Sequence, residues 1–225
     1  MNVEIDHLVV VADTLVQGAA WCQATLGVAP DPGGRHPLMG THNRLLAIGS
    51  EAFPRSYLEI IAVDPDAPDP GRVRWFGMDD PALREAVRAA PRLVHAVART
   101  SNIDMLRWGL VNVGIDPGVP LAAERDTPQG RLAWRIAVRD DGAVDRDGAL
   151  PTLIEWRGVH PTEGMPASPV QLTAVTAGGL SPRAAVVLRL RGVGVSAAPI
   201  PRWQATLQSP AGQVTLTAWP DEPTR

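Results

Sequence analysis

The chain has 225 residues, a length that suits one large domain or two small modules sharing a core. Hydrophobic residues make up 45% of it and charged residues 20%, with a net charge of −3, so a substantial core can form. It has no basic stripe of the kind that binds nucleic acid, and no apolar run approaches the ~18 residues of a membrane helix. The acidic N-terminus lacks the positive region of a signal peptide, so we expect a cytoplasmic protein with neither nucleic-acid nor membrane partners.

The cysteine and lysine content excludes several kinds of site. Cys22 is the only cysteine, so neither an internal disulfide nor a cysteine-rich zinc site can form. It lies in an apolar helical stretch, which indicates a buried structural thiol. All 21 basic residues are arginine, and this excludes a Schiff-base lysine and a P-loop lysine.

The first part of the chain predicts a strand, a helix, a loop and two more strands. Residues 3–11 are β-branched and apolar, as in a buried strand. Asp13 offers an N-cap for a helix that stops at Gly27. A glycine-rich loop, DPGGRHPLMGTHN, follows, and further strands are predicted over residues 44–49 and 56–63.

The same order of elements returns later in the chain. A strand is predicted over residues 92–100, and Asn102 can cap a helix that ends at Gly114. Strands are then expected over residues 119–125, 131–138 and 151–158. His7 and Gly27 are 20 residues apart, and His95 and Gly114 are 19 apart, so we interpret the chain as a duplication.

The remaining segments complete the expected organisation. Asp79 or Asp80 caps a short helix between the two units. A third, truncated copy has Val175 where the first has His7, and we expect it to cover a sheet edge. The expected parts are a first βαβββ module (1–66), a linker with a short helix (67–91), a second βαβββ module (92–165) and a C-terminal βαββ extension (166–225).

Superposing the two units aligns four residues of the types that bind metals. His7 falls on His95, and Glu59 falls on Glu155 after a shift of one residue. Both glutamates lie in apolar strands, and a buried carboxylate must be paired, neutralised or bound to metal. If the units pack about a pseudo-twofold axis, these four side chains converge on one divalent metal, for which nitrogen and oxygen ligands suit Ni, Co, Zn, Fe or Mn.

This pattern resembles the vicinal-oxygen-chelate superfamily, and more narrowly the glyoxalase-like domain proteins. The resemblance covers roughly residues 3–160 and rests on the segments IDHLVVVADT, GGRHPLMGTHNRLLAIG, YLEIIAVDP, LVHAVART and LPTLIEWRGVHP. It implies an α+β fold in which two βαβββ modules form a cupped eight-stranded mixed sheet. It also implies metal ligands on the first and last strand of each module, which are His7, Glu59, His95 and Glu155 here.

Three functions are compatible with such a site. The first is a metal-dependent lyase or isomerase acting on a small oxygenated metabolite, with Glu155 or Glu59 as the base. The second is an extradiol-type dioxygenase, against which the fourth ligand, Glu59, counts. The third is a metal-free protein that sequesters a small molecule, with the histidines and glutamates paired as ions. The resemblance also raises the prospect of a homodimer.

Other polar residues are candidates for contacts with a small-molecule substrate. The glycine-rich loop contains His36, His42, Asn43 and Arg44, and loops at the mouth of a sheet often carry binding residues. The matching stretch of the second unit offers Arg131 and Trp134, whose ring could form a flat apolar wall. His160, beyond Glu155, is interpreted as a turn residue.

Overall fold

The structure is a computed structural model that describes residues 3–127, 130–144, 149–196 and 203–220. Its first half contains β1 (Glu4–Val11), α1 (Leu15–Leu26), β2 (Asp31–His36), β3 (Thr41–Ala47) and β4 (Tyr57–Val63). A turn (Trp75–Gly77) and α2 (Pro81–Ala89) lead to β5 (Arg92–Arg99), α3 (Ile103–Asn112), β6 (Val119–Thr127), β7 (Gly130–Val138) and β8 (Thr152–Arg157). A turn (Pro161–Glu163), β9 (Gln171–Gly178), α4 (Pro182–Leu188), β10 (Val193–Ser196), β11 (Trp203–Ser209) and β12 (Gly212–Thr217) complete the described elements.

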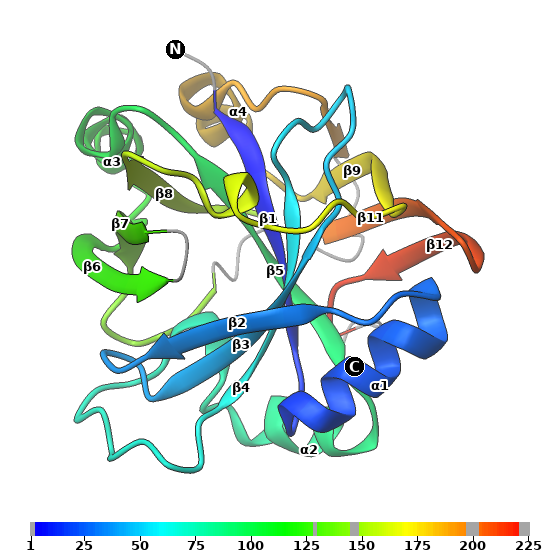
Figure 1. Ribbon diagram of the computed structural model, residues 1–225. Helices are drawn as coiled ribbons and strands as arrows, with labels where there is room; N and C mark the ends of the chain where they lie inside the picture. The colour runs from blue at the N-terminus through cyan, green and yellow to red at the C-terminus, as the bar shows by residue number, and fades with distance from the viewer. Residues whose placement is uncertain (1–2, 128–129, 145–148, 197–202, 221–225) are drawn as a thin grey trace.

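Eight strands form one cupped, mixed sheet, as the resemblance implied. Their order is β2-β3-β4-β1-β5-β8-β7-β6. The first strands of the two halves, β1 and β5, are antiparallel neighbours at the centre, and each is parallel to the last strand of its own half. Figure 1 shows β1 and β5 passing through the middle of the molecule, with the other strands of each half to either side.

The helices begin where short polar side chains accept a backbone hydrogen bond. Thr14, rather than the expected Asp13, caps α1 by accepting from the backbone N–H of Gln17, and Gly27 ends the helix with φ of 74°. Asn102 caps α3 as predicted. Asp80 caps α2 through the N–H of Ala82, which decides between the two predicted caps.

The two faces of the large sheet are covered differently. On the outer face, α1 packs against β3 and β4, and α3 packs against β6, β7 and β8. The buried cluster on this face includes Leu8, Val10 and Leu58. Cys22 of α1 is fully buried there, and burial raises the pKa of its thiol to about 12. On the concave face, Val9 and other strand residues pack against the linker turn and α2. The concave face is therefore narrowed by the segment that joins the two halves.

One expectation about local structure was wrong. The start of the glycine-rich loop forms β2, which pairs antiparallel with β3 at the edge of the sheet. The register shifts between Pro32 and Arg35, so Gly33 and Gly34 lie at an irregularity of the strand. Their missing side chains allow a close approach, because a Cβ at Gly33 would meet Asn43 and a Cβ at Gly34 would meet Arg125.

The C-terminal extension forms a second sheet of four strands. Its order is β10-β9-β11-β12, so it contains β10 in addition to the expected strands. Side chains such as Leu172, Trp203 and Leu207 belong to the same buried cluster as the outer face of the large sheet. The extension lies beside α1 at the right of Figure 1, where its strands are orange and red. It therefore adds to a core that it shares with the outer face of the large sheet, where β11 contacts β5 and β12 contacts α1.

None of the helices in the described part of the chain is both long enough and apolar enough to cross a membrane.

Candidate functional site

A fully buried carboxylate organises the polar residues of the first half. Asp6 accepts hydrogen bonds from His7 Nδ1 at 2.7 Å, His160 Nε2 at 2.9 Å and Trp156 Nε1 at 3.0 Å. Burial alone raises the pKa of Asp6, but the hydrogen bonds from His160 and His7 outweigh it and hold that pKa well below its usual value. Because Nδ1 of His7 donates to Asp6, its Nε2 is the nitrogen that faces the concave side.

Glu59 lies opposite this histidine, on β4. Its Oε2 is 3.5 Å from His7 Nε2, and its Oε1 accepts a hydrogen bond of 2.6 Å from Asn43 Nδ2. His36 Nε2 is 3.9 Å from Oε1. The Glu59 side chain is only 7% exposed, so a buried carboxylate faces two imidazoles and one amide. Such a carboxylate in a cavity wall is a candidate acid or base.

His36 is buried and held in place on β2. Its Nδ1 lies 3.1 Å from the hydroxyl of Thr41, and its ring meets Trp75 edge-on at 5.1 Å between centroids. The pKa of His36 is lowered to about 4, mainly by burial; the nearby Glu59 opposes this shift and Arg125 adds to it. The imidazole is therefore neutral at neutral pH.

Two neighbouring spaces lie at this site. A small cavity of about 30 Å³ is lined by His7, Glu59 and the aromatic rings that face them, which is room for roughly one water molecule. A larger cavity of about 380 Å³ lies next to it and shares Leu45 and Arg125 with its lining.

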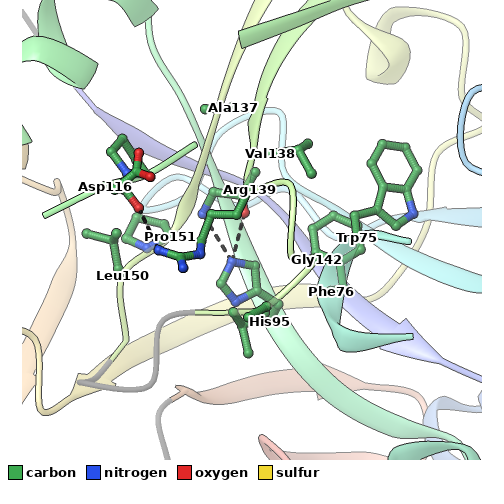
Figure 2. Close-up of a pocket in the computed structure, with 14 residues that line it drawn as sticks. Trp75, Phe76, His95, Asp116, Ala137, Val138, Arg139, Gly142, Leu150 and Pro151 are labelled. Atoms are coloured by element: carbon green, nitrogen blue, oxygen red, sulfur yellow. Dashed lines mark hydrogen bonds between the residues drawn. The ribbon is translucent and has the colours of Figure 1, made fainter. Parts of the chain in front are cut away.

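Two aromatic rings of the linker lie between this site and the pocket that contains His95. Trp75 and Phe76 stack on each other at 5.2 Å, and both line the small cavity and a second pocket beyond it. Phe76 has φ of 56°, a backbone conformation that a bulky residue rarely adopts. Its ring lies 5.7 Å from His95, and Figure 2 shows that histidine in the second pocket, opposite Trp75 and Phe76.

His95 does not belong to the cluster of polar side chains around Glu59. It contacts Thr152 of β8 instead. Its Nε2 is 3.0 Å from the hydroxyl of Thr152 and accepts from the backbone N–H of the same residue at 3.1 Å. Val9, two residues after His7, pairs with Glu59, and Val97, two residues after His95, pairs with Thr152. Thr152 therefore occupies in the second half the position that Glu59 has in the first.

Glu155 points to the other face of the sheet. Leu153 belongs to the outer cluster and Ile154 to the concave one, so the alternation of a strand turns Glu155 outward. Its carboxylate is 3.4 Å from Arg135, which also forms two hydrogen bonds of 2.7 Å to Asp104 on α3. The structure thus pairs the second predicted glutamate with an arginine beside a helix.

Only some of the residues predicted to contact a substrate lie at the small cavity. The structure brings His36, Asn43 and Trp134 to the small cavity, where Trp134 packs against Trp156. It does not bring His42, Arg44 or Arg131 there. Arg44 pairs with Ile60 on the outer side, His42 is 3.9 Å from Asp64, and Arg131 is exposed and paired with Glu124.

Some residues at the site were not selected from the sequence. They are Asp6, Tyr57, Trp75, Phe76, Arg125 and Trp156, together with His160, which was interpreted as a turn residue. Asp6 could have been noticed, because it is a charged residue within an apolar strand. Tyr57 stacks on His7 at 4.6 Å and shares the face of Glu59, so strand alternation could have identified it. The linker aromatics carried no comparable signal.

The described residues do not fit the predicted four-ligand metal site. Across residues 3–127, 130–144, 149–196 and 203–220, no group of three or more histidine, cysteine, aspartate or glutamate side chains is arranged to hold a metal ion. His7 and Glu59 face one another, whereas His95 lies beyond Phe76 and Glu155 on the opposite face.

Comparisons with known proteins agree with the architecture. Residues 5–193 match a family model described as a glyoxalase-like domain, and no curated protein matches the chain. The solved structure of a hypothetical protein from Staphylococcus aureus has a TM-score of 0.60 and 15% identity, covering 98% of this chain and 87% of that one. A variant of Streptomyces coelicolor methylmalonyl-CoA epimerase, in complex with 2-nitronate-propionyl-CoA, has a TM-score of 0.43 and 17% identity, covering 69% and 96%. At such identity the first of these shows a common fold alone.

Proposed function

The chain belongs to the glyoxalase-like domain family, and on this premise we propose that it is a lyase or isomerase that uses Glu59 to remove a proton from a carbon next to a carbonyl group. The observation that carries the proposal is the place of Glu59. Its carboxylate is nearly buried, faces His7 and Asn43, and lines a cavity that adjoins a larger one. Acid–base groups in enzymes are commonly found in such clefts.

The proposed step moves one proton and no other atom. The C–H bond of the substrate breaks, its proton goes to the Glu59 carboxylate, and the electron pair becomes an enolate. His7 Nε2, 3.5 Å from Glu59 Oε2, is placed to supply or accept a proton at a neighbouring atom. Asp6 fixes the orientation of the imidazole through Nδ1, as the acidic partner of a catalytic histidine commonly does.

Proton exchange with solvent tests this proposal without requiring the natural substrate. A panel of small 2-oxo acids, hydroxyketones and methyl ketones is incubated with the protein in D₂O, and loss of the proton signal next to the carbonyl is followed by ¹H NMR. Glu59→Gln preserves shape and removes the base, so it should lower the exchange rate about 100-fold or more. Glu155→Gln is the matched control and should leave the rate unchanged, because Glu155 faces α3.

The outcomes separate the proposal from its main alternative. Full exchange activity in Glu59→Gln, in a variant whose circular dichroism and thermal unfolding match the parent protein, contradicts the assigned base. Binding of panel members without exchange in the parent protein favours the sequestering function, in which His7 and Glu59 form a buried pair.

A further inference from the structure

One cationic side chain from the second half reaches the site of the first. Arg125 lies on β6, directly opposite Leu132 of β7, and Leu132 belongs to the concave cluster. Residues opposite one another on neighbouring antiparallel strands share a face, so Arg125 also faces the concave side. It lines both the small cavity beside Glu59 and the larger cavity of about 380 Å³.

The guanidinium rests against the edge strand of the first half. A Cβ built on Gly34 would lie 2.1 Å from Arg125 Nη1 and 2.9 Å from its Cζ, so the glycine leaves the space that this side chain fills. The polar contact of Nη1 is a long hydrogen bond of 3.5 Å to Asn43 Oδ1. No carboxylate among the described residues forms an ion pair with Arg125, in contrast to Arg35, Arg99 and Arg135.

Asn43 sets the spacing between this cation and the proposed base. Its Oδ1 accepts from the backbone N–H of Gly34 at 2.8 Å and from Arg125, while its Nδ2 donates to Glu59. These contacts fix which way the amide points. Arg125 and Glu59 therefore lie on opposite sides of one side-chain amide, which places an anion-binding group next to a proton acceptor.

The adjoining cavity supplies apolar contacts. Its lining includes Leu45, Leu132, Val159 and Met165 together with several prolines and glycines. Its volume of about 380 Å³ falls within the ~300–1,000 Å³ of typical ligand pockets. Asp31 is the carboxylate in this lining, and it makes no ion pair with Arg125. Arginine binds carboxylates through paired N–H donors.

We propose that Arg125 binds the carboxylate of the substrate, and that the larger cavity holds its hydrocarbon chain. The substrate class is a 2-oxo or 2-hydroxy carboxylic acid with an apolar chain. This assignment rests on the proposed function for the carbon that reacts, but the binding of the carboxylate stands on Arg125 and its surroundings alone.

Two probes that differ only in the carboxylate test the inference. In 2-hexanone a methyl group replaces the carboxylate of 2-oxohexanoate, and the rest of the chain is the same. Binding is measured by NMR titration of the indole N–H signals, since Trp134 and Trp156 line the small cavity. A charge-assisted hydrogen bond predicts that the parent protein binds 2-oxohexanoate about 10- to 100-fold more tightly than 2-hexanone.

Two arginine variants assign the difference to one side chain. Arg125→Met keeps the apolar stem and removes the charge, so it should bind both probes equally, with 2-hexanone bound as in the parent protein. Arg131→Gln changes an exposed arginine of the neighbouring strand that pairs with Glu124, and should keep the full preference. Equal binding of the two probes by the parent protein, or an unchanged preference in Arg125→Met, overturns the inference.

The same titrations distinguish this inference from the proposed function. Glu59→Gln should still bind 2-oxohexanoate through Arg125, even though proton exchange is lost. An Arg125-dependent preference without proton exchange in the parent protein contradicts the proposed chemistry and supports the carboxylate site. Proton exchange without that preference supports the proposed chemistry and contradicts the carboxylate site.

Discussion

Burial of a histidine beside a carboxylate couples stability to pH. The pKa of His36 falls from 6.5 to about 4 in the folded protein, mainly because of burial. Between these values the unfolded chain binds more protons than the folded one, so stability decreases as the pH falls. Above about pH 6.5 the histidine is neutral in both states and the contribution to stability is fully present.

We expect the free energy of unfolding to fall by up to about 3 kcal/mol between pH 7.5 and pH 4.5 because of His36, since each pKa unit corresponds to ~1.36 kcal/mol. Urea unfolding followed by circular dichroism at several pH values measures this. Asp6 does not contribute to this interval, because its lowered pKa affects stability only below about pH 3.8. In His36→Gln the slope with pH should be smaller, and an identical slope would show that His36 is not its source.

At the scale of elements, strand register decides which predicted ligands could meet. The sequence places both glutamates in apolar strands, and the structure confirms the strands but turns Glu59 and Glu155 to opposite faces. Matching them required a shift of one residue, and a shift of one residue reverses the face of a strand. Strand alternation also separates Arg131 from Trp134, which are three residues apart. Strict alternation along β8 and β6 places Thr152 and Arg125 on the concave face instead.

Gly34, at the irregularity of β2, leads to a prediction about the position of the Arg125 side chain. A Cβ at Gly34 would meet the far end of the Arg125 side chain, which can move, so Gly34→Ala should change stability by less than about 0.5 kcal/mol. The displaced guanidinium should nevertheless reduce the preference for 2-oxohexanoate over 2-hexanone. Urea unfolding and the NMR titration measure the two effects.

Gly33→Ala is the comparison variant. Its Cβ would lie 2.5 Å from the backbone oxygen of Asn43, which cannot move without disturbing the pairing of β2 with β3. Overpacking of this kind costs about 1–3 kcal/mol. If Gly34→Ala retains the full carboxylate preference, or if Gly33→Ala is as stable as the parent protein, the described packing of this edge is wrong.

For the whole molecule, the order of the elements could be predicted, whereas the contacts across the cup could not. Apolar patterning and capping residues indicated both βαβββ units, and the resemblance supplied the arrangement of their strands in one cupped sheet. The insertion of Trp75 and Phe76 between His36 and His95 depends on where a linker packs, and no local pattern determines that. Because of this insertion and the register of β8, His95 and Glu155 do not join His7 and Glu59 at one site.

We expect the C-terminal sheet to unfold together with the large sheet, and substitution of Trp203 tests this. Its side chain is 1% exposed and packs in the core cluster that also contains Leu8 and Leu58 of the large sheet. Trp203→Ala should therefore lower the free energy of unfolding by about 3–5 kcal/mol in one cooperative transition. A separate early transition of the variant, with the large sheet unfolding as in the parent protein, would instead indicate an independent C-terminal unit.

We propose that the reacting molecule binds on the concave face of the first half, beside Glu59 and Arg125. A crystal structure of the protein with bound 2-oxohexanoate tests it most directly. We expect the carboxylate within hydrogen-bonding distance of Arg125 and the carbon chain in the cavity lined by Leu45 and Leu132, with the ketone directed toward Glu59. Density for the ligand in the pocket of His95, or a metal ion held jointly by His7, Glu59, His95 and Glu155, would contradict it.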